Sequence, residues 1–174
     1  MGLSGAGPDN VTAPAPLAAG HDLYAFACGE AMLDDWLRRR AMPNQLRGVS
    51  RTYVVTRDNQ VVGYYSLAAG AIAVEGAPGR VRRNVPDPIP MAVLGRLAID
   101  RGQQGRGLGR LLLRDAILRT RQAAETIGIR GLLVHALSPA AKRFYETSGF
   151  RESPANPMTL MVTLADAVAA IGGA

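Results

Sequence analysis

A glycine-rich loop carries the residue spacing with the clearest chemistry in this sequence. It covers residues 102–109, follows an apolar stretch over residues 91–99, and precedes a long helical pattern that begins with leucines at 108, 111 and 112. Glycine lets a backbone come close to a phosphate, and the first turn of a helix offers unpaired N–H groups and the positive end of the helix dipole. The spacing therefore predicts an anion-binding loop, with close packing of a strand against a helix as the alternative.

Two familiar phosphate loops do not fit this stretch. The form G-x-x-x-x-G-K-[ST] needs a lysine that the loop lacks, and the dinucleotide form G-x-G-x-x-G does not match glycines at 102, 105, 107 and 109. The loop instead has the form Q-x-x-G-x-G, which starts at Gln104 and ends at Gly109. We expect the backbone N–H groups from Gln104 to Arg110 to hold the anion.

Positive charge is concentrated in one part of the chain. The net charge is +6, but nine arginines and two carboxylates between positions 38 and 83 give that segment +7, so the remainder sums to −1. Such a region is typical of proteins with a polyanionic partner such as nucleic acid. The alternative is a solvated face in an arginine-biased protein, because 19 of the 20 basic residues are arginine.

Several classes of protein are excluded by composition. The single cysteine, Cys28, excludes a disulfide framework, and no spacing of the C-x-x-C or H-E-x-x-H kind predicts a metal site. The apolar runs are shorter than the ~20 residues that a membrane span requires, and the N-terminus lacks the features of a signal peptide. We therefore expect a cytoplasmic protein.

The elements that must position the loop follow from hydrophobic periodicity and turn residues. Residues 1–10 are expected to form a flexible leader, and residues 11–174 a single domain. A helix is predicted over residues 32–41, ended before Pro43, followed by a hairpin of residues 51–56 and 61–73. Further strands are predicted at 91–99, 131–137 and 158–164, with helices at 106–127 and from Ser138 to Gly149.

A second motif makes a family resemblance specific. Residues 141–150 have the form A-x-x-[LF]-Y-x-x-x-G-F, and one helix and one strand separate them from the glycine loop. The two motifs together resemble the GNAT acyltransferases, which take an acyl group from acyl-CoA. The resemblance implies an α/β GNAT fold with a mixed, twisted sheet of six or seven strands flanked by about four helices. Acyl-CoA would lie where strands 91–99 and 131–137 split apart.

The same resemblance implies the roles of individual residues. Tyr145 matches the family's general acid, and Ser138 stands where many members have an asparagine that contacts the cofactor. Because transfer in this family is direct, Cys28 is not required as a nucleophile. The residues expected to bind acetyl-CoA are Leu97, Ala98, Ile99, Gln104, Gly105, Arg106, Gly107, Leu108, Gly109, Arg110, Ser138 and Phe144.

A narrower resemblance covers most of the chain. Segments LDDWL at 33–37, SRTYV at 50–54 and LGRLA at 94–98 are similar to the GNAT toxins of bacterial toxin-antitoxin pairs. That resemblance implies acetylation of the α-amino group of aminoacyl-tRNA and arrest of translation. It also implies a ribbon-helix-helix antitoxin as partner, with DNA contacted only through that antitoxin; a homodimer stays open. The arginines expected to contact tRNA are Arg38, Arg39, Arg40, Arg47, Arg51, Arg83 and Arg96.

The chemistry of the acceptor agrees with an α-amine. A lysine side chain with a pKa of ~10.4 is neutral in well under ~0.1% of molecules at pH 7, whereas an α-amine of pKa ~7.7–8.0 is roughly 10–15% neutral. An α-amine can therefore use water as its proton acceptor, although His135 is a candidate relay. Two alternatives remain: a GNAT enzyme acting on a protein N-terminus or a small amine, and a non-catalytic acyl-CoA-dependent regulator.

Overall fold

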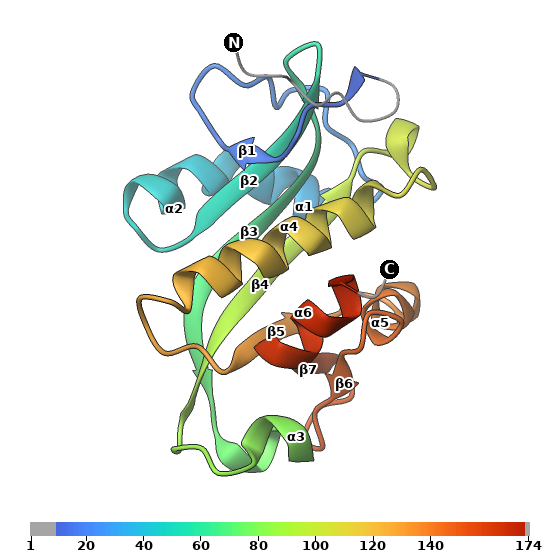
Figure 1. Ribbon diagram of the computed structural model, residues 1–174. Helices are drawn as coiled ribbons and strands as arrows, with labels where there is room; N and C mark the ends of the chain where they lie inside the picture. The colour runs from blue at the N-terminus through green and yellow to red at the C-terminus, as the bar shows by residue number, and fades with distance from the viewer. Residues whose placement is uncertain (1–9, 173–174) are drawn as a thin grey trace. The chain divides into compact units, whose positions relative to one another are not determined.

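The computed structural model describes residues 10–172 and contains a mixed sheet of seven strands (Figure 1). The strand order is β1-β2-β3-β4-β5-β7-β6, in which β4 and β5 are parallel while β1–β2, β2–β3, β5–β7 and β6–β7 are antiparallel. This confirms the predicted mixed sheet. The strands are β1 Ala15–Pro16, β2 Arg51–Arg57, β3 Gln60–Ile72, β4 Ile89–Ile99, β5 Gly131–His135, β6 Arg151–Glu152 and β7 Thr159–Thr163.

Six α-helices accompany the sheet within the described residues. They are α1 Ala31–Trp36, α2 Met42–Leu46, α3 Gly79–Arg82, α4 Leu108–Ala123, α5 Pro139–Glu146 and α6 Leu164–Gly172. A π-helical turn, η2, covers Leu37–Ala41, and 3₁₀ turns cover Val74–Gly76 and Arg101–Gln103. Helix α6 was not expected, because the tail it forms has only a weak apolar pattern in the sequence.

The chain divides into two compact units, each with its own apolar cluster. The first unit comprises Met1–Leu67 and Arg96–Asp115, and the second comprises Ala68–Gly95 and Ala116–Ala174. All but the last residue of the predicted leader lies outside the described residues. The assignment of residues 11–174 to a single domain stays a prediction.

The first unit is built on the predicted hairpin. Asp58 and Asn59 have φ angles of 50° and 65°, the left-handed conformation that a tight two-residue hairpin turn requires. Behind the hairpin, the ring of Trp36 stacks on Tyr64 at 6.0 Å, and the Tyr64 hydroxyl donates a hydrogen bond of 2.7 Å to the Leu33 carbonyl. Trp36 therefore belongs to the apolar core of the first unit.

The helix expected to end before Pro43 instead continues to Leu46. The π-helical turn η2 inserts between α1 and α2, so that Pro43 falls in the first turn of α2. Proline lacks the N–H that a residue inside a helix donates, and the irregular π-helical turn stands directly before α2. Arg38, Arg39 and Arg40 consequently lie on the π-helical turn rather than at a helix end.

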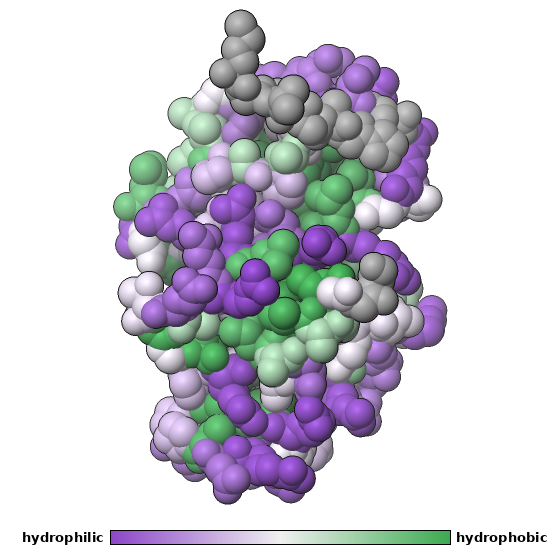
Figure 2. Space-filling view, viewed as in Figure 1, coloured by the Kyte–Doolittle hydropathy of each residue, from purple (hydrophilic) through white to green (hydrophobic). Residues whose placement is uncertain are grey.

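The second unit packs β5 against β4 and β7 around a cluster that includes Ile89, Met91, Leu133 and Met161. Helix α3 contributes Val81 to this cluster, while the other side of α3 is polar. Hydrophilic side chains gather around α3 on the face shown in Figure 2. Arg80 and Arg82 on α3 and Arg83 directly after it are all exposed.

Candidate functional site

The glycine loop connects the end of β4 to the start of α4 in the first unit. Gly105 and Gly107 have φ angles of 78° and 85°, and a Cβ atom at either position would meet nothing within 4 Å. The backbone conformation, not a lack of space, therefore favours glycine here. Because Gly107 is left-handed, α4 begins at Leu108 and not at position 106 as the sequence predicted.

Side chains hold both ends of the loop in place. The Asp100 carboxylate accepts hydrogen bonds from the backbone N–H groups of Ala27 and Gly102, each at 3.0 Å. The Gln104 side-chain amide donates to the Cys28 carbonyl at 2.8 Å and to the Ile99 carbonyl at 2.9 Å. The conspicuous glutamine of the Q-x-x-G-x-G motif thus positions the loop through its side chain.

The start of α4 presents backbone donors. The first helical hydrogen bond runs from the Leu111 N–H to the Gly107 carbonyl at 3.1 Å, so the N–H groups of residues 108–110 precede the intrahelical pattern. Leu108 is buried, whereas Arg106, Arg110 and Arg114 are exposed on the loop and helix. This is the arrangement of donors and positive charge that suits a pyrophosphate.

Helix α4 is fixed to the hairpin by close packing. A Cβ atom added to Gly63 of β3 would lie 2.9 Å from the Val55 side chain and 3.2 Å from that of Leu112, so only glycine admits α4 this closely. The Tyr65 hydroxyl donates a hydrogen bond to the Asp115 carboxylate, which ties β3 to the second turn of α4. The direction of the helix start is therefore set by the sheet.

Strand β4 extends beyond its parallel partner. The pairing of β4 with β5 runs from Met91 with Gly131 to Leu94 with Val134, whereas β4 continues to Ile99. The predicted cofactor residues Leu97, Ala98 and Ile99 occupy this extension, with Ala98 buried in the core of the first unit. The pairing of the two strands thus ends at Leu94, and the binding of acyl-CoA by residues 97–99 stays a prediction.

Tyr145 lies on α5 in the second unit. Ser138 begins this helix as predicted, its hydroxyl accepting a hydrogen bond of 3.1 Å from the Ala141 N–H. The Tyr145 ring packs between Phe144 and Phe150, with centroid distances of 5.1 and 5.5 Å, and the residue is 7% exposed. Burial raises the pKa of the Tyr145 phenol above its ordinary value, so the phenol keeps its proton at neutral pH.

Arg96 points its guanidinium at an aromatic ring. The guanidinium carbon lies 4.3 Å from the Trp36 ring centroid, a cation–π contact in the first unit. Burial lowers the pKa of Arg96, and the nearby Tyr64 opposes that shift. The anticipated anion contact of Arg96 stays a prediction.

The other arginines assigned to tRNA fall into two groups. Arg38 donates a hydrogen bond of 2.8 Å to the Phe26 carbonyl and lies 3.6 Å from Asp35, so it also has a structural role. Arg39, Arg40, Arg47 and Arg51 are exposed on η2, the end of α2 and the start of β2 in the first unit. Arg83 belongs to the second unit, directly after α3.

Two other candidate groups have structural partners. Burial, reinforced by Asp34, raises the pKa of the Cys28 thiol to about 11, so the reactive thiolate is scarce at neutral pH. This agrees with a structural Cys28. The His135 Nδ1 atom lies 2.9 Å from the Thr159 hydroxyl, which joins β5 to β7.

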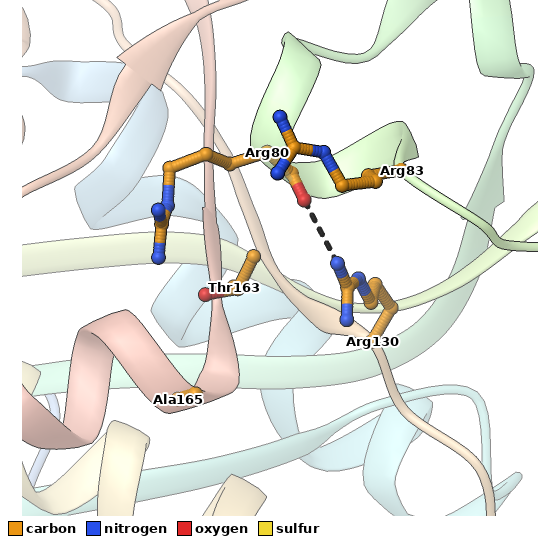
Figure 3. Close-up of a pocket in the computed structure, with 5 residues that line it drawn as sticks. All are labelled: Arg80, Arg83, Arg130, Thr163 and Ala165. Carbon is orange, nitrogen blue, oxygen red and sulfur yellow. Dashed lines mark hydrogen bonds between the residues drawn. The ribbon is translucent and has the colours of Figure 1, made fainter.

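The sequence did not predict a small cationic pocket in the second unit (Figure 3). Arg83 lines it together with Arg80, Arg130, Thr163 and Ala165. The cluster of arginines at 80, 82 and 83 was visible in the sequence, but nothing there indicated that Arg130, nearly fifty residues later, lies beside it.

Residues 10–172 contain neither a metal-binding cluster nor a membrane-spanning helix. No group of three or more His, Cys, Asp or Glu side chains is placed to hold a metal ion. No helix in this part of the chain has the length and apolar character needed to cross a membrane.

Comparison with known proteins identifies relatives over nearly the whole chain. Residues 48–152 match the Acetyltransferase (GNAT) domain family. A Mycobacterium tuberculosis protein named tRNA-acetylating toxin is 52% identical over 161 residues, which cover 92% of this chain and 97% of that protein. Among solved structures, AtaT complexed with acetyl-methionyl-tRNAfMet has a TM-score of 0.85 and 31% identity, covering 92% of this chain and 99% of that chain. A mutant AtaT toxin bound to the C-terminus of the antitoxin AtaR and acetyl-CoA has a TM-score of 0.79 and 30% identity. The match covers 94% of this chain and 99% of that chain.

Proposed function

The chain belongs to the GNAT acetyltransferase family, and from that membership we propose that it transfers the acetyl group of acetyl-CoA to the α-amino group of aminoacyl-tRNA. The observation that carries this proposal is the 52% identity to the tRNA-acetylating toxin, since it extends over 92% of the chain. The exposed arginines of the first unit support it as candidate contacts for RNA phosphates.

The loop residues have the chemistry needed to hold acetyl-CoA. The left-handed Gly105 and Gly107 and the N–H groups at the start of α4 would bind the pyrophosphate. Arg106 and Arg110 add positive charge on the same segment. Backbone N–H groups of residues 97–99 would polarise the thioester carbonyl, so that charge developing on its oxygen is stabilised.

The proposed reaction is a direct transfer. The neutral α-amine attacks the thioester carbonyl carbon, a carbon–nitrogen bond forms, and the carbon–sulfur bond breaks. The amine loses its proton to water, and the Tyr145 hydroxyl gives its proton to the departing sulfur and regains one from solvent. A free phenol of pKa ~10 is a weaker acid than a thiol of pKa ~8.5, and burial of Tyr145 widens that gap. Protonation of the sulfur must therefore accompany cleavage of the carbon–sulfur bond.

The proposed biological role is that of a toxin in the cytoplasm, where acetylated aminoacyl-tRNA no longer serves translation. Its partner would be an antitoxin with a ribbon-helix-helix DNA-binding end and a tail that covers the enzyme, so that DNA is contacted only through the antitoxin. A structural neighbour, AtaT, binds the C-terminus of its antitoxin AtaR, which supports this role.

The direct test is to incubate the purified chain with acetyl-CoA and a mixture of charged tRNAs. Mass spectrometry of the released aminoacyl groups should show N-acetylation with the wild-type chain and far slower N-acetylation with Tyr145→Phe. A peptide with a free N-terminus serves as the competing acceptor. The proposal is wrong if the peptide is acetylated while every charged tRNA remains unmodified.

A further inference from the structure

A cationic pocket of about 210 Å³ lies in the second unit, apart from the residues used in the proposed chemistry. Its walls come from three separate segments: α3 with the residue after it, the residue before β5, and the junction of β7 with α6. Figure 3 shows the Arg83 and Arg130 side chains on one side and Thr163 and Ala165 on the other. Among the residues that the structure describes, the lining contains three arginines and no carboxylate.

Arg130 is held in place before any ligand arrives. Its guanidinium donates to the Val81 carbonyl at 3.1 Å and to the Arg80 carbonyl at 2.8 Å, the second bond being drawn in Figure 3. Its backbone N–H donates to the Pro90 carbonyl at 2.9 Å, and its carbonyl accepts from the Leu164 N–H at 3.0 Å. These contacts use two of the five guanidinium N–H donors and leave the others for an anion.

The charges around the pocket are only partly compensated. Arg80 forms two hydrogen bonds of 2.7 Å to the Asp166 carboxylate, and these two side chains neutralise each other. Arg83 is exposed and, within residues 10–172, has no ion-pair or hydrogen-bond partner for its guanidinium. Arg83 and Arg130 therefore leave the pocket with an uncompensated charge of about +2.

The size and lining of the pocket favour a phosphate over an acidic peptide. An arginine guanidinium can donate two parallel hydrogen bonds to two oxygens of one phosphate. The Thr163 hydroxyl accepts a hydrogen bond of 3.1 Å from the Asp166 N–H and still has its own proton to donate. Within the described part of the chain, Ala165 is the only apolar residue of the lining, whereas a peptide segment needs an apolar surface for its side chains. The volume suits one tetrahedral anion and its water.

We propose that Arg83, Arg130 and Thr163 bind one backbone phosphate of the RNA acceptor, away from its aminoacyl end. This rests on the proposed function, because it takes RNA to be the acceptor. The contact positions the substrate and takes no part in acetyl transfer. The contact can be detected through the salt dependence of RNA binding. Each phosphate contact releases counterions, so the loss of one contact makes the RNA affinity less dependent on salt.

The test measures the affinity of uncharged tRNA for the full chain over a range of KCl concentrations. Arg83→Gln should weaken binding about tenfold near 0.1 M salt and reduce the slope of log affinity against log salt by about 0.9. Arg83→Lys keeps the charge and should retain most of the slope while losing paired hydrogen bonding. Arg121→Gln, which removes another exposed charge, on α4, should behave as the wild type.

Two outcomes would overturn the proposal. One is an Arg83→Gln variant with an unchanged melting temperature and a wild-type salt slope. The other is a normal slope combined with weaker binding of the purified antitoxin, which would assign the pocket to an acidic peptide. Failure of the proposed function is distinct: charged tRNA would then remain unacetylated by the wild-type chain, whatever the binding slopes of the variants.

Discussion

At the scale of single residues, Tyr145 carries the proposed acid catalysis. Tyr145→Phe removes one hydroxyl and keeps the ring between Phe144 and Phe150, so we expect a folded protein. Loss of a general acid should reduce kcat about 10²–10⁴-fold, with little change in affinity for acetyl-CoA. The measurement is release of the CoA thiol at saturating substrates.

The pH dependence of the wild-type rate gives a second check on Tyr145. Because burial raises the pKa of its phenol, deprotonation of Tyr145 should cause no loss of rate between pH 6 and pH 9. A descending limb with a midpoint near pH 8 that disappears in Tyr145→Phe would contradict this account.

Cys28, in contrast to Tyr145, is expected to take no part in the reaction. With its pKa raised to about 11, the thiol should be deprotonated in only about one molecule per thousand at pH 8. Iodoacetamide should therefore label Cys28 at least about 10-fold more slowly than it labels a small thiol of pKa ~8.5, because the scarcity of the thiolate outweighs its higher nucleophilicity. Cys28→Ala should retain kcat, and rapid labelling of the native chain would refute this assignment.

The same shift links Cys28 to stability. Its folded-state pKa lies above the ordinary value of the unfolded chain, so the folded state favours the protonated thiol. The resulting contribution to the free energy of unfolding is fully present below the unfolded pKa and is lost as the pH rises toward 11.

At the scale of elements, the glycine loop depends on one side chain to hold its shape. Gln104→Ala removes the hydrogen bonds to the carbonyls of Cys28 and Ile99, each worth ~0.5–1.5 kcal/mol in a typical protein. Because Gln104 is exposed and water can replace part of this loss, we expect the Kd for acetyl-CoA to rise about 3- to 10-fold. Calorimetric titration of the unreacted protein measures that Kd.

A matched control for Gln104→Ala is available on α4, the helix that follows the loop. Gln122 is also exposed, lies on α4 and is far from the loop in sequence, so Gln122→Ala should leave the Kd unchanged. Equal effects of the two substitutions would show that Gln104 does not position the loop.

The elements also show which features a sequence reveals. The glycine spacing and the Ser138-Pro139 helix start could be predicted because their cause is local: a left-handed backbone in one case and a capping hydroxyl in the other. The hydrogen bond from the Gln104 side chain to the Cys28 carbonyl joins positions 76 residues apart. No local pattern encodes such contacts, and the same applies to Arg130 on the carbonyls of α3.

At the scale of the whole molecule, the distribution of charge is the main expectation still to be tested. The net charge is +6, and the segment between positions 38 and 83 contains all the tRNA-assigned arginines except Arg96. If that segment contacts RNA, the effect of replacing an arginine on tRNA affinity must depend on the position of that arginine. If it is only a solvated surface, affinity will depend on total charge alone.

Two triple variants of equal charge separate these cases. Arg39, Arg40 and Arg47 are exposed in the first unit, and their joint replacement by glutamine should reduce the slope of log tRNA affinity against log salt by about 2 to 3. Replacement of the exposed Arg121, Arg143 and Arg151, which all lie outside that segment, lowers the net charge equally and should change that slope by less than about 1. Slow acetylation of a neutral amine, if detectable, should be the same in both variants, because neither triple touches the loop or Tyr145. Equal slopes for the two triples would indicate a solvated surface and would leave the arginines of η2 without a role in binding RNA.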